Sequence, residues 1–122
     1  MTDLVPLKPV VWMGTSRRDL SGMPEKVQAD FGYALYVAQL GDKHRNAKPL
    51  TGFGGGGVVE IVSDHRGDTF RCIYTVRLAG SIFVLHAFQK KSKTGRATPK
   101  AEIEMVKSRL RDAERVAKGQ TA

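Results

Sequence analysis

The sequence predicts a single α+β domain, residues 1–122, in which helices pack on an antiparallel sheet. Its 122 residues, 41% of them hydrophobic, suit one core and are too few for two. Apolar residues recur at helical spacing near both ends of the chain, whereas β-branched and aromatic residues cluster in its middle. This segregation of helical and strand patterns is typical of helices covering a sheet.

The N-terminal third predicts one short strand and two helices. Residues 10–13 form an apolar run after Pro9, as expected at an edge strand. Thr15 or Ser16 can cap a short helical turn over residues 17–20. A longer helix begins near Pro24 and ends at Gly41. One face of this helix is apolar, and a second apolar flank predicts that another helix or a partner covers it: Tyr33, Tyr36, Val37 and Leu40.

The rest of the chain predicts a loop, a meander and a closing helix. The glycine run at residues 54–57 predicts a loop, and it lacks both the Gly-Lys-Ser/Thr ending and the following helix of a phosphate-binding loop. Thr98 as N-cap and Pro99 at the first position predict the start of the last helix. Three strand-like runs with short connections lie between these features: residues 58–63, 69–78 and 81–88.

Charge and cysteine content restrict the classes of function. The net charge is +8, and the residues from Gln89 onward hold ten basic and four acidic residues, so nucleic acid or an acidic protein is the expected partner. A solvated helix face is the alternative for this basic stretch. Cys72 is the only cysteine, which excludes a disulfide scaffold and a zinc finger, and the histidines show no metal-ligand spacing. We expect no metal, no cofactor, no membrane span and a cytoplasmic location.

Three segments carry a family resemblance. They are residues 50–54 leading into 59–61, residues 69–74, and residues 85–100, which include Phe-Gln-Lys-Lys-Ser-Lys ahead of Thr-Pro. From about Lys8 to Arg115 the chain resembles the RelE/ParE toxin superfamily, most closely its HigB-like, phage-related branch. One departure is Val62, where many relatives place an arginine.

The resemblance implies a RelE-like fold: a curved antiparallel sheet with the N-terminal helices on one side, a concave basic surface on the other and a basic C-terminal helix. It implies the toxin of a type II toxin-antitoxin module, a metal-independent endoribonuclease (mRNA interferase) that cleaves mRNA on the ribosome. The expected partners are mRNA, the ribosome and a cognate antitoxin of helix-turn-helix type. Two alternatives stay open, a gyrase-inhibiting ParE-like toxin and a non-catalytic RNA-binding or interaction module of phage origin.

Metal-free RNA cleavage needs a proton acceptor, cations around the five-coordinate phosphate and a proton donor for the leaving 5′ oxygen. Arg71 is the first candidate cation, because a guanidinium on an inner strand is costly unless it meets solvent or a partner; pairing with Glu60 is the alternative. Lys90 is the second candidate cation, because it lies four residues after His86 in the last predicted strand and should point to the same face of the sheet. His86 and Glu60 are the candidate acid or base, with core and ion-pair roles as their alternatives.

Four further residues are predicted to bind RNA. Lys91, Lys93 and Arg96 lie in the basic stretch after the last strand, where lysine and arginine can contact phosphates. Tyr74 can stack on a base, but it is equally typical of a core aromatic residue. Cys72 is expected to be a small buried residue, because no neighbouring motif indicates a nucleophile.

Overall fold

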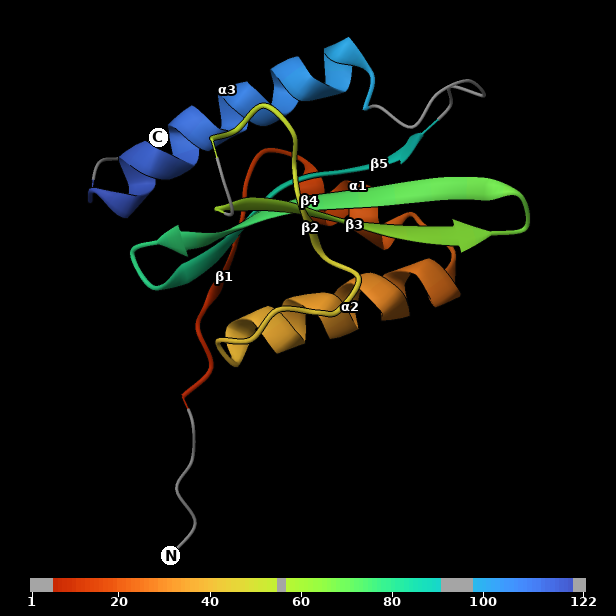
Figure 1. Cartoon of the computed structure of the whole chain (residues 1–122), viewed down its shortest axis with the longest axis horizontal. Coiled ribbons are helices and arrows are strands. Elements are labelled where there is room, and N and C mark those ends of the chain that lie inside the picture. Colours follow the sequence, from red (N-terminus) through yellow and green to blue (C-terminus); the bar gives the residue numbers. More distant parts are fainter. Residues whose placement is uncertain (1–5, 55–56, 91–97, 120–122) are drawn as a thin grey trace, which may run out of the picture.

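The computed structural model describes residues 6–54, 57–90 and 98–119, and in this part of the chain three helices surround one five-stranded sheet (Figure 1). The elements follow one another in this order: β1 (Val10–Trp12), α1 (Ser16–Ser21), α2 (Glu25–Gln39), β2 (Lys48–Pro49), β3 (Val58–His65), β4 (Asp68–Leu78), β5 (Ser81–Lys90) and α3 (Lys100–Ala117).

The sheet has the strand order β1-β5-β4-β3-β2, and its centre is the predicted antiparallel meander β3-β4-β5. The sheet as a whole is mixed, because β1 pairs with β5 in parallel, with Val11 opposite Phe83. The two strands can run in the same direction because α1, α2 and the rest of the sheet separate them along the chain. Residues 48–49, for which no strand was predicted, form the short edge strand β2.

Tight turns hold the meander in register. Arg66 and Gly67 join β3 to β4, and Ala79 and Gly80 join β4 to β5. All four residues have positive φ, between 49° and 85°, which is the backbone of two-residue type I′ hairpins. These turns bring His65 opposite Asp68 and thereby fix which side chains share a face of the sheet.

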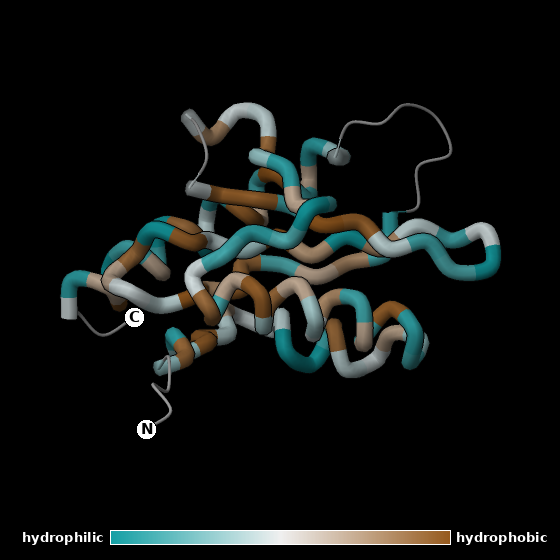
Figure 2. Tube along the Cα trace, turned by 60° about the horizontal axis from the view of Figure 1, so that its bottom comes forward, coloured by the Kyte–Doolittle hydropathy of each residue, from teal (hydrophilic) through white to brown (hydrophobic). Residues whose placement is uncertain are grey.

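One face of the sheet is covered by α2 together with α1, as predicted for the N-terminal helices (Figure 1). Hydrophobic residues recur along both layers in Figure 2, as expected when one helix face meets alternate strand residues. Val27 and Phe31 of α2 are fully buried there, against Ile61, Cys72 and Tyr74.

The opposite face is partly covered by α3, which lies on the other side of the sheet from α2 (Figure 1). Val106 and Ala113 of this helix pack against Ile73, Phe83 and Leu85. The resemblance had implied a concave basic surface on this side, together with a basic C-terminal helix. In the described structure α3 covers part of this face, because the apolar stripe of the helix is buried against the sheet.

Both long helices begin one position later than predicted. Pro24 and Pro99 occupy the N-cap positions of α2 and α3, and neither helix has a side-chain cap hydrogen bond. Thr98 therefore does not cap α3. Its hydroxyl is instead used in a tertiary contact with the sheet.

Candidate functional site

Arg71 is buried at the centre of the sheet on the face that α3 covers. It belongs to β4, the strand between β3 and β5, and its residue is 7% exposed. One guanidinium nitrogen, Nη1, donates hydrogen bonds to Glu60 Oε2 and to Thr98 Oγ1, each at 3.0 Å. A carboxylate and a hydroxyl thus offset the cost of burying this charge. The pairing with Glu60 that the sequence left open is present, and it places a carboxylate and a cation in one site.

Lys90 lies on the same face as Arg71. It stands opposite Thr69 in the register, while Arg71 stands opposite Phe88, and residues two apart in a strand share a face. Lys90 is half-exposed at the end of β5. Lys90 and His86 therefore lie on the same face of the sheet, as predicted. Lys91, Lys93 and Arg96 lie outside the described residues.

A β-bulge in β5 turns His86 toward α3. His86 pairs with Ile73 and Val84 pairs with Tyr74, so Leu85 is an additional residue between these two pairs. Such a bulge places two successive side chains on the same side of the sheet. Leu85 consequently joins the apolar cluster under α3, and His86 lies beside it rather than on the α2 face.

Both ring nitrogens of His86 contact α3. Nε2 lies 3.2 Å from Glu102 Oε2, and Nδ1 lies 3.2 Å from Arg109 Nη1. The ring also stacks on Phe88, with 4.7 Å between centroids and 25° between planes. His86 is 7% exposed, and this burial lowers its pKa below the usual 6.5, although the Glu102 carboxylate acts in the opposite direction.

Arg109 connects His86 to the turn between β1 and α1. Its Nη1 donates to the Leu85 carbonyl and its Nη2 donates to Thr15 Oγ1, both at 3.0 Å. Thr15 in turn donates to Asp19 at 2.7 Å, and this hydrogen bond lowers the pKa of the Asp19 carboxyl. A continuous chain of polar contacts therefore joins α1, β5 and α3.

Sequence reasoning missed Glu102 and Arg109 as site residues. Both were assigned no role in the site and were counted among the charges of the C-terminal quarter. A signal for them exists, since Glu102, Val106, Arg109 and Ala113 follow one another at steps of four, three and four. Charged residues on the buried stripe of a helix indicate a partner on the facing sheet.

Tyr74 is not brought to this site. It faces α2, on the opposite side of the sheet from Arg71, and is 1% exposed. Burial raises its pKa to about 12, and its hydroxyl has no hydrogen-bond partner among the described residues. Cys72 lies on the same face as Tyr74, and burial raises the pKa of its thiol to about 12 as well, so it is not a reactive thiolate.

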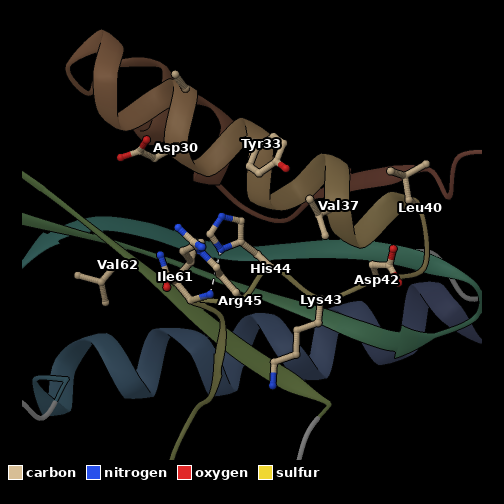
Figure 3. A pocket seen from close by; sticks show the side chains of 12 residues that line it. Asp30, Tyr33, Val37, Leu40, Asp42, Lys43, His44, Arg45, Ile61 and Val62 are labelled. Carbon is tan, nitrogen blue, oxygen red and sulfur yellow. Dashed lines mark hydrogen bonds between the residues drawn. The ribbon is translucent and has the colours of Figure 1, made fainter.

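Two cavities border these elements. One, of about 620 Å³, lies between α1, the end of β5 and the start of α3, and His86, Glu102 and Asp19 line it. The other, of about 850 Å³, lies between α2, the residues 42–46 and β3, and Figure 3 shows Tyr33 and His44 on its wall. The rings of Tyr33 and His44 pack edge to face, with 5.5 Å between their centroids. Tyr33, Tyr36 and Leu40, which belong to the predicted second flank of α2, are 60%, 47% and 37% exposed.

Metal sites and membrane-spanning helices are absent from the part of the chain that the structure describes. No group of three or more histidine, cysteine or acidic residues within the described ranges could hold a metal ion. No helix in them is long and apolar enough to cross a bilayer.

Comparisons with known proteins identify the family. Searches of curated proteins and of solved structures gave no significant match. The family model of the phage-derived protein Gp49-like family (DUF891) matches residues 18–111, most of the chain, without distinguishing a HigB-like branch. The chain therefore belongs to the Gp49-like family of phage-derived proteins, which is a RelE/toxin-like family.

Proposed function

We propose that this protein is the HigB-like toxin of a type II toxin-antitoxin module and acts as a metal-independent endoribonuclease on mRNA in the ribosome. The observation that carries the proposal is the Arg71 site, where a buried guanidinium lies 3.0 Å from the Glu60 carboxylate. Arg71 belongs to β4, the neighbour of β5, and β5 ends at Lys90 in the basic stretch. The RelE-like family membership supports the same conclusion.

The proposed chemistry uses a cation and a carboxylate held side by side. The 2′-hydroxyl gives its proton to a carboxylate, for which Glu60 is the candidate beside Arg71, and its oxygen bonds to phosphorus. The bond from phosphorus to the 5′ oxygen then breaks, its electron pair stays on that oxygen, and the oxygen takes up a proton from water. The products are a 2′,3′-cyclic phosphate, or the 3′-phosphate formed from it, and a 5′-hydroxyl end.

Arg71 stabilises the charge that develops on the phosphoryl oxygens during this attack. Its planar guanidinium matches phosphate oxygens, and its contacts with Glu60 and Thr98 hold it in place before substrate binds. Lys90, on the same face at the end of β5, supplies a second positive charge for the RNA backbone. Lys91, Lys93 and Arg96 follow it in the sequence and are proposed to bind the same backbone.

The proposed partner on the other side of the molecule is an antitoxin. Tyr33 and Leu40 of α2 line the 850 Å³ cavity (Figure 3), and Tyr36 is exposed on the same helix. Aromatic residues of this kind are enriched in protein interfaces. A cognate antitoxin of helix-turn-helix type covers this flank of α2 or, on the α3 side, the basic surface that the resemblance implies. Expression of the protein alone should be toxic, and co-expression of the adjacent gene should remove the toxicity.

Mapping of RNA ends on translating ribosomes tests the enzymatic proposal. The wild-type protein should generate new 5′-hydroxyl ends, Arg71→Ala should not, and Arg77→Ala should match the wild type because Arg77 is exposed on the same strand. Absence of new ends with a folded wild-type protein overturns the ribonuclease. Gyrase-dependent DNA damage would then identify a ParE-like toxin, and RNA binding without cleavage would identify a non-catalytic module.

A further inference from the structure

The contact between Arg109 and His86 restricts where the imidazole carries its proton. A guanidinium has N–H donors and no acceptor, so Arg109 Nη1, 3.2 Å from His86 Nδ1, must donate to that nitrogen. Nδ1 therefore carries no hydrogen. In a neutral imidazole the proton then resides on Nε2, which faces the Glu102 carboxylate at 3.2 Å and donates to it.

Arg109 is itself held in place by the fold. Its guanidinium donates to the Leu85 carbonyl and to Thr15, and it lies directly against the backbone of Gly14. A Cβ atom at Gly14 would lie 2.5 Å from Arg109 Nε, and Gly14 has a φ of +54°, which favours glycine. The turn after β1 is thus shaped to admit this guanidinium, so the contact with His86 is preorganised.

The charged groups around His86 act in opposite directions. On α3, Glu102 favours the protonated ring and Arg109 disfavours it; on α1, the Asp19 carboxylate favours it weakly. From β4 the ring faces Ile73, which carries no charge. Burial is the largest influence, and the resulting pKa of His86 lies below 6.5, in agreement with the neutral ring that the geometry requires.

We propose that Arg109 is a positioning residue that fixes His86 as the Nε2–H tautomer and thereby limits it to donating hydrogen bonds from Nε2. The role in the reaction rests on the proposed function: His86 does not serve as the proton acceptor, because its basic nitrogen is covered by a cation. It acts as a neutral donor that orients the Glu102 carboxylate on the wall of the 620 Å³ cavity.

Nitrogen-15 NMR of the imidazole rings in the full-length protein tests the tautomer directly. At neutral pH His86 should show the chemical shifts and couplings of an Nε2–H ring. A proton on Nδ1, or a doubly protonated ring at pH 7, overturns the proposal. This measurement needs no substrate, so it separates failure of the positioning role from failure of the proposed ribonuclease.

Variants of Arg109 test whether this residue sets the tautomer. In Arg109→Met the His86 ring should become a mixture of tautomers and should titrate at higher pH than in the wild type, because the facing cation is gone. Arg111→Met removes the same charge from an exposed position of α3 and should leave the His86 spectrum unchanged. An unchanged spectrum in Arg109→Met overturns the proposal. If that variant does not fold, Arg109→Lys, which keeps one charged donor, should give a smaller change of the same kind.

Cleavage assays test the consequence for the reaction. His86→Gln keeps a donor but cannot titrate near neutral pH, so it should retain cleavage within about tenfold of the wild type, whereas loss of a general base costs about 10² to 10⁴-fold. A loss in the latter range, in a variant with a normal thermal melt, overturns the donor role. If the wild type does not cleave RNA, the donor role in cleavage fails with the proposed function, and the NMR result still decides whether Arg109 positions His86.

Discussion

The two faces of the sheet bury different kinds of side chain. Under α2 the buried cluster is apolar, with Phe31, Cys72 and Tyr74 at its centre. Under α3 an apolar cluster lies beside buried charges, among them Arg71 and Arg109, which are 7% and 9% exposed. Burying a charge costs free energy unless partners compensate it, so the second face is specified by hydrogen-bond geometry as well as by apolar area.

This difference indicates that the two faces of the sheet serve different roles. The α2 face holds the larger cluster of buried hydrophobic residues, and the α3 face holds the polar groups that a site requires. Substitutions on the first face should therefore change the free energy of unfolding, whereas substitutions on the second should change activity or pH dependence more than stability.

The largest expected effect is on stability. Phe31→Ala removes a fully buried ring under α2 and should lower the free energy of unfolding by about 3 to 5 kcal/mol. Tyr33→Ala, two positions along the same helix at a 60% exposed residue, should change it by less than about 0.5 kcal/mol. Urea denaturation of both variants measures the difference, and equal losses would contradict the assignment of the main core to this face.

Next in size is the effect of Arg71→Ala on cleavage. Under the proposed function the variant should lose about 10² to 10³-fold in rate, the range for one charge-stabilising donor, with a modest loss of ribosome affinity. Arg71→Lys keeps the charge without the planar fork and should recover part of the rate. Thermal melts must accompany the assay because Arg71 also pairs with Glu60. Wild-type cleavage by folded Arg71→Ala would make Arg71 a structural residue.

A smaller effect is expected at Gly14. Gly14→Ala combines a positive φ with a clash against Arg109, whereas Gly41→Ala has a φ of +90° and open space around the added methyl group. The backbone cost is shared by both variants, so Gly14→Ala should be less stable than Gly41→Ala by about 1 to 3 kcal/mol, the usual cost of overpacking. Similar stabilities in urea would show that the Arg109 guanidinium moves aside without cost.

The smallest effect is a pH dependence of stability from His86. Its folded pKa lies below 6.5, so the unfolded chain binds more protons as the pH falls below about 7.5. The stabilisation is fully present above this range and is lost as the pH falls through 6.5 toward the folded pKa. The slope for one proton cannot exceed about 1.4 kcal/mol per pH unit.

Unfolding curves between pH 8 and pH 5 should show this slope in the wild type and a weaker one in His86→Gln. His65→Gln, at the half-exposed end of β3, is the matched control and should keep the wild-type slope. Asp19 and Asp30 also have lowered pKa values, but their contribution is lost near pH 4 and below, outside this window. An unchanged slope in His86→Gln would place the titrating group elsewhere.

Much of the fold was predictable from local pattern. The predicted long helix near Pro24, observed as α2 over Glu25–Gln39, and the three-strand meander were confirmed, because apolar periodicity and short turns act over neighbouring residues. The pairing of β1 with β5 was not predictable, since residues 10–12 carry no signal that distinguishes a parallel from an antiparallel neighbour. The edge strand β2 is too short to produce any alternation.

The candidate site, like the fold, was predictable from the sequence only in part. The sequence by itself determined that Arg71 lies on an inner strand, that Lys90 and His86 share a face and that the C-terminal quarter is basic. These features depend only on residues that are close together along the chain, since side chains alternate along a strand and charge is a property of composition. Only the tertiary structure decided that Arg71 meets Glu60 and Thr98, and that Arg109 and Glu102 enclose His86. Those contacts join residues 11 to 27 positions apart, and their geometry depends on a bulge in β5 and on the packing of α3.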